Sequence, residues 1–338
     1  MLRLAALVIF VFGNVEAAAQ QYDWQDYQSE LSWSGELSYT ISDFADQLSD
    51  RWQIAQEGYL LEAGDITEAE ASATIADIIE QRERMYAEFT AQIEFLLEQE
   101  PSTGDARLDS GIDAVASASR MFLVEAEQAF ALDARMAEHF RSFPEELERQ
   151  DAAANLTTAR TAADVYLANS RLWLLFTDDQ QFLHRGLIAD IEFTECQNRL
   201  RAIEAVFQTG NVEQVPVLAS ELRDHAERLN RLSRSYGNFA SMTATRWRSE
   251  LNEDNDRPDQ HQASIELAEA YAELFEAYEA TAPLFMSMMS ISRQATGLDE
   301  FLGHMDEPQA EFFDAFQAIS RTSSAVDDAQ ARLDAFYE

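Results

Sequence analysis

The chain of 338 residues contains no lysine, and this absence excludes several classes of enzyme. Its 24 basic side chains are all arginine, against 62 carboxylates, which gives a formal net charge of −38. Without lysine there is no Schiff-base enzyme, no pyridoxal-phosphate anchor and no P-loop lysine. A surface this acidic also repels the phosphates of nucleic acids and anionic lipid headgroups, so we expect neither as a partner.

Two explanations for this charge stay open. The protein could work in high salt, where an acidic surface stays soluble and screening suppresses its self-repulsion. Alternatively, a GC-rich genome biases codons away from lysine and towards the many alanines seen here. The two explanations are compatible, and unfolding measured across a salt series distinguishes them.

Cysteine and histidine are also scarce, which limits metal and redox chemistry. The single cysteine, Cys196, cannot form an internal disulfide and falls on an apolar helix face, as expected for a buried, inert thiol. None of the five histidines has a glutamate three residues before it, so the paired Glu-x-x-His turns of di-iron bundles are absent. No Gly-x-Ser-x-Gly elbow and no glycine-rich phosphate loop is present. The sequence therefore predicts no cofactor, no metal and no catalytic residue.

The first nineteen residues have the pattern of an export signal. Arg3 precedes an uncharged run over residues 4–12, and small residues at 17–19 suit cleavage after Ala19. The alternative is a buried N-terminal helix. The longest later uncharged stretch, 280–292, is too short to span a bilayer. We therefore expect an exported protein, periplasmic or extracellular, without stable membrane insertion.

The rest of the chain, residues 20–338, predicts an all-α fold in a single elongated domain. Apolar residues recur at spacings of three and four nearly throughout, without sustained strand-like alternation. Breaks are expected around Gly64, Pro101 to Gly104, Pro144, Gly210, 252–259 and Pro308, with Pro283 kinking or restarting a helix. Seven or eight long helices with heptad-like seams favour an antiparallel bundle.

The clearest heptad-like repeat lies in the predicted helix after Gly210, and it contains a histidine. His225 takes an apolar seam position there, with Glu221 one turn before it. One interpretation is a buried polar site that senses pH or contacts a ligand. The other is a core histidine bonded to a neighbour, or a polar residue that fixes the pairing of two helices.

Two further segments are candidate interaction surfaces. Tyr22, Trp24, Tyr27 and Trp33 form a dense aromatic group for a chain end, and exposed aromatic residues favour interfaces. Methionines 286, 288 and 289 lie in a segment with little charge, and methionine-rich faces adapt to different partners. For both segments the alternative is packing within the bundle itself.

Two short motifs resemble known sites. The His-x-x-Glu spacing of His304 and Glu307 is similar to the Gly-x-His-x-x-Glu signature of imelysin-like periplasmic helical proteins, although here glycine directly precedes the histidine. A loop leading into a helix at Pro308 explains the same residues. The run 252–256 is similar to an EF-hand loop, but Arg257 replaces its glycine and Ala263 its bidentate glutamate.

These observations favour an exported, acidic helical bundle that acts by binding a protein or a small ligand and has no enzymatic activity. One alternative is an all-helical pore-forming protein, since the chain has long helices and an apolar segment beside Pro283. Another is a helical enzyme that uses a metal or a substrate through acidic side chains. Dye release from liposomes tests the former, and elemental analysis of purified protein tests the latter.

Overall fold

The computed structural model describes residues 22–48, 52–139, 144–176, 181–251 and 257–336, and the fold is all-α as predicted. The proposed export signal, 1–19, lies outside these residues. The described part contains no strand beyond one isolated bridge between Tyr22 and Phe176. Its helices are η1 (Trp24–Tyr27), α2 (Gln28–Leu48), α3 (Trp52–Ala63), α4 (Glu68–Glu98), α5 (Ala106–His139), α6 (Pro144–Trp173), α7 (Gln181–Thr209), η2 (Val212–Gln214), α8 (Val215–Glu250), α9 (Pro258–Gln294) and α10 (Leu298–Asp334).

Local sequence signals explain several of the helix ends. The Thr67 side chain accepts a hydrogen bond from the Glu70 backbone N–H, and the Glu70 carboxylate accepts one from the Thr67 N–H, which forms a capping box for α4. Gly64, Gly104 and Gly210 adopt positive φ angles of 78°, 76° and 75° at breaks between helices. Only glycine takes this conformation without strain, so these three predicted breaks are confirmed.

The predicted helix start at Pro308 is wrong, and so is the alternative in which a helix restarts at Pro283. α9 runs through Pro283, and α10 begins at Leu298 and runs through Pro308, ten residues before the predicted start. A proline inside a helix removes one backbone hydrogen bond. Pro283 is exposed, so the carbonyl that loses its partner can bond to water instead. His304 consequently lies inside α10, where its Nδ1 is 2.8 Å from the Glu300 carbonyl oxygen, and not in a loop.

The inward face of α6 differs from the predicted one by one position. The apolar spacing of this segment predicts Leu156, Ala159, Ala163, Tyr166 and Trp173 on the inward face. Ala159 is instead exposed, the three that follow it are half-buried, and the side chain of Leu156 lies outside the described residues. The described residues of α6 that are buried are Thr158, Ala162, Val165, Ala168, Asn169, Ser170 and Leu172. α5 approaches this face closely at Gly111, because a Cβ there would lie 2.7 Å from Leu172 Cδ1.

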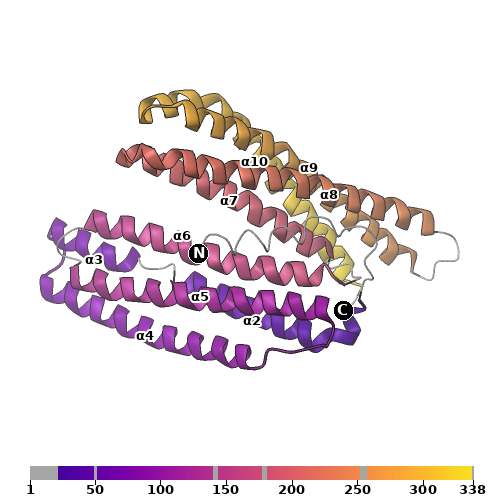
Figure 1. Ribbon diagram of the computed structural model, residues 1–338, viewed down its shortest axis with the longest axis horizontal. Coiled ribbons are helices and arrows are strands. Elements are labelled where there is room, and N and C mark those ends of the chain that lie inside the picture. The colour runs from indigo at the N-terminus through magenta and orange to yellow at the C-terminus, as the bar shows by residue number, and fades with distance from the viewer. Residues whose placement is uncertain (1–21, 49–51, 140–143, 177–180, 252–256, 337–338) are drawn as a thin grey trace.

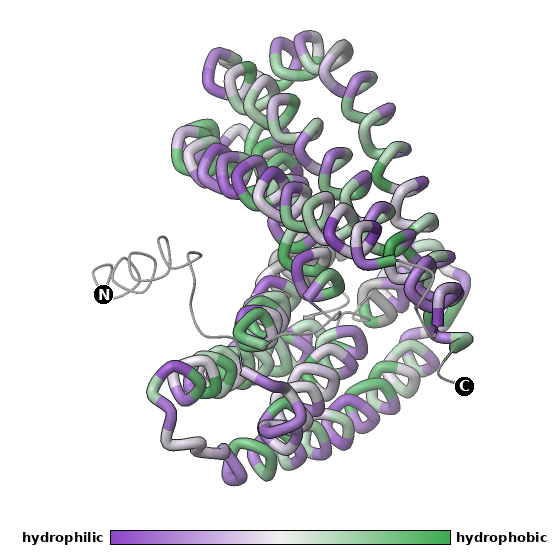
Figure 2. The backbone as a smooth tube through the Cα atoms, turned by 90° about the vertical axis from the view of Figure 1, so that its right-hand side faces the viewer, coloured by the Kyte–Doolittle hydropathy of each residue, from purple (hydrophilic) through white to green (hydrophobic). Residues whose placement is uncertain are grey.

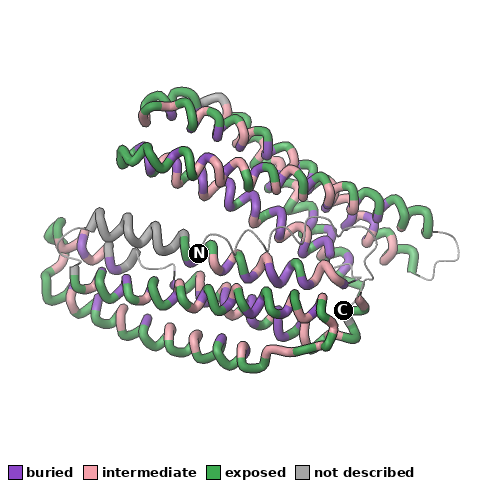
Figure 3. Tube along the Cα trace, in the orientation of Figure 1, coloured by how far each residue is buried: buried purple, intermediate pink, exposed green. Residues whose placement is uncertain are grey.

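The helices form two groups, α2 to α6 and α7 to α10, and α6 packs against α7 between them (Figure 1). Hydrophilic and hydrophobic residues alternate along the helices (Figure 2), and the buried residues lie where helices face one another (Figure 3). One apolar core lies within α7 to α10 and two smaller ones within α2 to α6. Leu167 and Leu174, in and just after α6, also pack against the α7–α10 core.

Candidate functional site

The N-terminal aromatic residues pack largely onto their own bundle. Tyr22 and Tyr27 are half-buried, and each ring centroid lies 5.9 Å from that of Phe176. Trp33 is buried, and its indole N–H donates a 2.7 Å hydrogen bond to the Leu96 carbonyl. The side chain of Trp24 lies outside the described residues.

The methionine-rich segment of α9 also contributes to the core. Met288 and Met289 are buried within the apolar core of α7 to α10, and Met286 is half-buried against it. In this arrangement only Met286 keeps appreciable exposure. A binding role for this segment stays a prediction.

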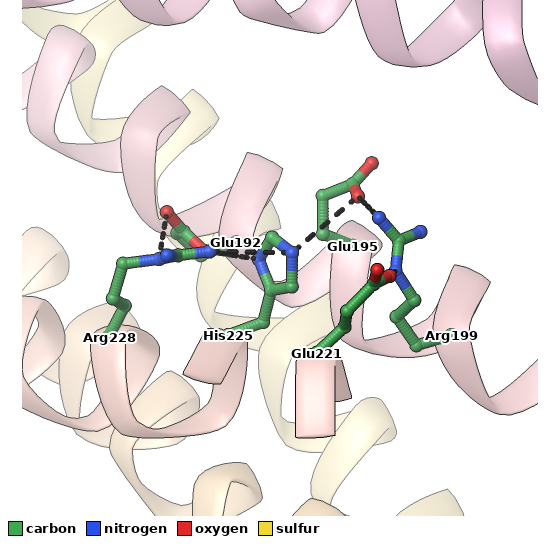
Figure 4. Close-up of polar contacts among 6 residues, drawn as sticks. All are labelled: Glu192, Glu195, Arg199, Glu221, His225 and Arg228. Carbon is green, nitrogen blue, oxygen red and sulfur yellow. Dashed lines mark hydrogen bonds and ion pairs between the residues drawn. The ribbon is translucent and has the colours of Figure 1, made fainter. Parts of the chain in front are cut away.

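Glu221 and His225 belong to a cluster of charged residues where α7 faces α8. His225 does not bond to Glu221 but approaches Glu192 of α7, with 2.7 Å between Nδ1 and Oε2. The Nε of Arg228 donates to both Glu192 oxygens at 3.1 Å. Glu192 is only 4% exposed, so it is a buried carboxylate with two cationic or polar partners (Figure 4).

The second half of the cluster follows directly along both helices. The Nε of Arg199 donates a 2.6 Å hydrogen bond to Glu221 Oε2, and its Nη2 lies 3.1 Å from Glu195 Oε2. Glu195 and Arg199 are 6% and 4% exposed. His225 links the two halves, because its Nε2 is 3.8 Å from Glu195 Oε2. We name Glu192, Glu195, Arg199, Glu221, His225 and Arg228 the α7–α8 charge cluster (Figure 4).

The charge balance of the cluster determines the state of its buried carboxylate. Burial raises the pKa of Glu192, but the hydrogen bond from His225 and the charge of Arg228 outweigh it and hold the pKa below its usual range. Glu192 is therefore ionised at neutral pH. With His225 neutral, the cluster holds three carboxylates against two guanidinium groups, and protonation of His225 balances them.

The cluster residues share a helical spacing that the sequence already contains. On α7, Ile188, Glu192, Glu195 and Arg199 follow one another at intervals of four, three and four, as seam positions do. On α8, Glu221, His225 and Arg228 show the same pattern. Of these residues, only Glu221 and His225 were predicted from the sequence. The α7 residues were missed because the apolar stripe through Phe193 and Cys196, on a neighbouring face of the helix, dominated the pattern.

Cys196 lies beside the charge cluster but takes no part in it. Its thiol is fully buried, and desolvation followed by the charge of Glu192 raises its pKa well above the usual value. It is therefore protonated and unreactive at neutral pH, as predicted for an inert thiol.

A buried histidine, His184, lies where α7 meets α6. Its ring stacks on Trp173 with 5.0 Å between centroids, and its Nδ1 is 3.4 Å from Ser170 Oγ. Its Nε2 is buried without a hydrogen-bond partner within the described residues. Desolvation lowers the pKa of His184 to about 4, so this imidazole is neutral at pH 7.

Within the described residues, no group of three or more histidine, cysteine, aspartate or glutamate side chains is arranged to hold a metal ion. None of the helices described is both long and apolar enough to cross a membrane. A broad surface hollow lies between α2 and α4, away from the charge cluster, and polar residues such as Asp43, Arg84 and Glu88 line it above Phe89. The charge cluster pairs carboxylates with guanidinium groups across the contact of α7 and α8.

Comparison of the chain with protein-family models, with curated proteins and with solved structures gave no match. The function therefore has to be inferred from the residues of this chain alone.

Proposed function

We propose that this protein is an exported, acidic helical bundle that acts by binding a partner protein and has no catalytic activity of its own. The leader-like residues 1–19 support export to the periplasm or the medium. The net charge of −38 makes nucleic acids and anionic membranes poor partners and favours a protein with a basic surface.

The observation that carries the proposal is an exposed apolar flank on α10. Leu302, Phe313 and Phe316 are 40%, 59% and 43% exposed. They share one side of the helix, because their positions differ by eleven and then by three. α10 packs chiefly on α9, at the edge of the α7–α10 group (Figure 1). We name these three residues the α10 flank.

The α10 flank is continuous with the core and bordered by acidic residues. The ring of Phe316 stacks near buried Phe193, with 6.3 Å between centroids, so the flank begins where the core ends. Glu311 and Asp314 are exposed beside it. Large aromatic side chains at such positions are typical anchors of protein interfaces. The partner that fits is a protein with an apolar groove and a basic rim.

Capture of a partner from the native extracellular or periplasmic fraction tests this proposal. The double variant Phe313→Ser/Phe316→Ser should lose the partner that the unchanged protein retains. The matched control Phe95→Ser/Met121→Ser removes two residues of similar exposure, 63% and 61%, on α4 and α5, and should retain it.

Two outcomes contradict the proposal. Equal capture by both double variants removes the α10 flank as the contact. If the α10 variant shows enzymatic turnover, binding is not the sole function of the protein. Sedimentation of the unchanged protein and of the α10 variant is the companion measurement. If the unchanged protein is a dimer that the α10 substitutions dissociate, the partner is a second copy of the chain, and the expectation of a partner with a basic rim is wrong.

A further inference from the structure

The surroundings of His225 impose opposite demands on one ring nitrogen. Nδ1 lies 2.7 Å from Glu192 Oε2 and 2.8 Å from Arg228 Nη2. An ionised carboxylate only accepts hydrogen bonds, so the first contact requires a proton on Nδ1. A guanidinium group only donates, so the second contact requires Nδ1 without a proton. Only one of these two hydrogen bonds can form at a time, and the same Arg228 Nη2 also lies 3.3 Å from Nε2, to which it can donate when that nitrogen has no proton.

The other ring nitrogen faces a carboxylate oxygen that lacks a hydrogen bond. His225 Nε2 is 3.8 Å from Glu195 Oε2, which is too far for a hydrogen bond in the present arrangement. That oxygen is buried and accepts no hydrogen bond from the described residues, although the charge of Arg199 lies 3.1 Å away. A small movement of either side chain would bring Nε2–H within bonding distance of it.

The charged groups around His225 come from three helices. α7 supplies Glu192, Glu195 and Arg199, and α8 supplies Glu221 and Arg228. α6 supplies Asp164, which is exposed. Desolvation raises the pKa of this carboxyl; the charge of Arg160 acts in the opposite direction, and the charge of Glu195 raises the pKa further. Arg171 of α6 lowers the same pKa and Glu192 raises it. On the α9 side of α7, Tyr278 donates a 2.8 Å hydrogen bond to Asp190.

We propose that His225 is a proton-operated clasp between α7 and α8. When the imidazole is protonated, Nδ1–H donates to Glu192 and Nε2–H closes onto Glu195, so one side chain of α8 holds two carboxylates of α7. When it is neutral, one of these hydrogen bonds is lost, and the ring nitrogen without a proton accepts a hydrogen bond from Arg228 instead. The α7–α8 contact is therefore tighter at mildly acidic pH than at alkaline pH.

The clasp lies at the joint between the two groups of helices. α7 packs against α6 of the first group as well as against α8 and α9 of the second. Asp164 extends the charged surroundings of the cluster onto α6. A change in how firmly α8 holds α7 therefore acts on the element that connects the groups. This device does not depend on the proposed binding function, and its test needs no partner.

Hydrogen exchange of the α8 amides over residues 222–229, compared at about pH 5.5 and about pH 8, tests the clasp. After correction for the intrinsic exchange rate, the unchanged protein should be about tenfold more protected at the lower pH, as expected for one charge-assisted hydrogen bond. His225→Gln should abolish the difference. His304→Gln, which replaces an exposed histidine on α10, should preserve it.

Two further measurements separate the clasp from a general effect on folding. Glu195→Gln keeps His225 and its partner Glu192, and should reduce the pH difference by more than half. Nitrogen NMR of the unchanged protein should show both ring nitrogens of His225 protonated at about pH 5.5, with one deprotonated at about pH 8. Equal protection at both pH values, the same pH difference in His225→Gln, an unaltered difference in Glu195→Gln, or a neutral ring at the lower pH would each overturn the proposal.

Discussion

One side of α7 packs on α9 and α10 through the aromatic ring of Phe193, whereas the side turned to α8 presents Glu192, Glu195 and Arg199. Both sides are buried, yet they contribute differently. Burial of apolar area stabilises without regard to direction. Burial of charges requires desolvation, which their attraction roughly offsets, so the charged side contributes more to selecting one arrangement than to stability. The predictions below test this difference, from the largest expected effect to the smallest.

Phe193→Ala should produce the largest loss of stability. The ring is 3% exposed, and its centroid lies 5.6 Å from those of both Tyr278 and Phe285. Its removal leaves a cavity on the apolar side, and we expect the free energy of unfolding to fall by about 3–5 kcal/mol in urea titrations. Leu183→Ala, at a position 46% exposed on the same helix, should change it by less than about 0.5 kcal/mol. A loss below about 1 kcal/mol for Phe193→Ala would contradict this account.

Glu192→Ala should destabilise by about 2–3 kcal/mol, because it leaves two groups of α8 without their anion. This loss of stability is smaller than the loss expected when one partner of a fully buried ion pair is removed, because the Arg228 side chain is 32% exposed and can bind water instead. The triple variant Glu192→Leu/His225→Leu/Arg228→Leu should recover most of the loss, since apolar packing replaces the whole group of charges. A triple variant less stable than Glu192→Ala would show that the charged side contributes net stability.

The unfolding of the protein should depend on the protonation of His184. Its pKa is about 4 in the folded protein and near 6.5 when unfolded, so the unfolded chain binds more protons between these values. The stabilisation is present above pH 6.5 and is lost as pH falls towards 4. We expect this group to remove about 2 kcal/mol between pH 7 and pH 5. His184→Phe, which can still stack on Trp173, should lose about 2 kcal/mol less than the unchanged protein over that interval; identical pH profiles would contradict the lowered pKa.

The smallest expected effect concerns a glycine on α7. A Cβ at Gly186 would lie 3.1 Å from Cε1 of buried Tyr271 on α9, whereas a Cβ at Gly303 of α10 would meet nothing within 4 Å. Replacing a helical glycine by alanine contributes about 1 kcal/mol when space allows. Gly303→Ala should therefore raise the free energy of unfolding by about that amount in urea titrations, and Gly186→Ala by less. An equal gain at both positions would mean that α7 and α9 have room to adjust.

The fold could be predicted from the sequence because its signals are local. The spacing of apolar residues and the capping box of Thr67 and Glu70 each depend on residues within a few turns. The predicted helix boundaries at the prolines were wrong because a helix tolerates proline where the freed carbonyl can reach water. Whether that carbonyl is exposed depends on how the helices pack, which local sequence does not show. The predicted inward face of α6 was wrong because the prediction gave weight to the large side chains of Tyr166 and Trp173. In the structure, α5 contacts α6 closely at Leu172.

The charge cluster could be predicted only in part. The seam position of His225 was visible in the sequence, and so was the spacing of Glu192, Glu195 and Arg199. Which helix faces α8 was not visible, because Glu192 and His225 are 33 residues apart in the chain. Their contact depends on how two long helices align, and a repeat that is similar at every turn does not determine that alignment.

The order of charges along α7 and α8 answers that problem of alignment. Glu192 lies opposite Arg228 and Arg199 lies opposite Glu221, so each step along one helix is matched by an equal step back along the other. If α8 slid by two turns so that Glu221 came to face Glu192, Arg228 would come to face Arg185, which lies seven residues before Glu192 on α7. Both meetings would then join like charges in a buried interface. A shift in that direction is therefore unfavourable at two contacts, one between carboxylates and one between guanidinium groups. The apolar repeat alone would allow it.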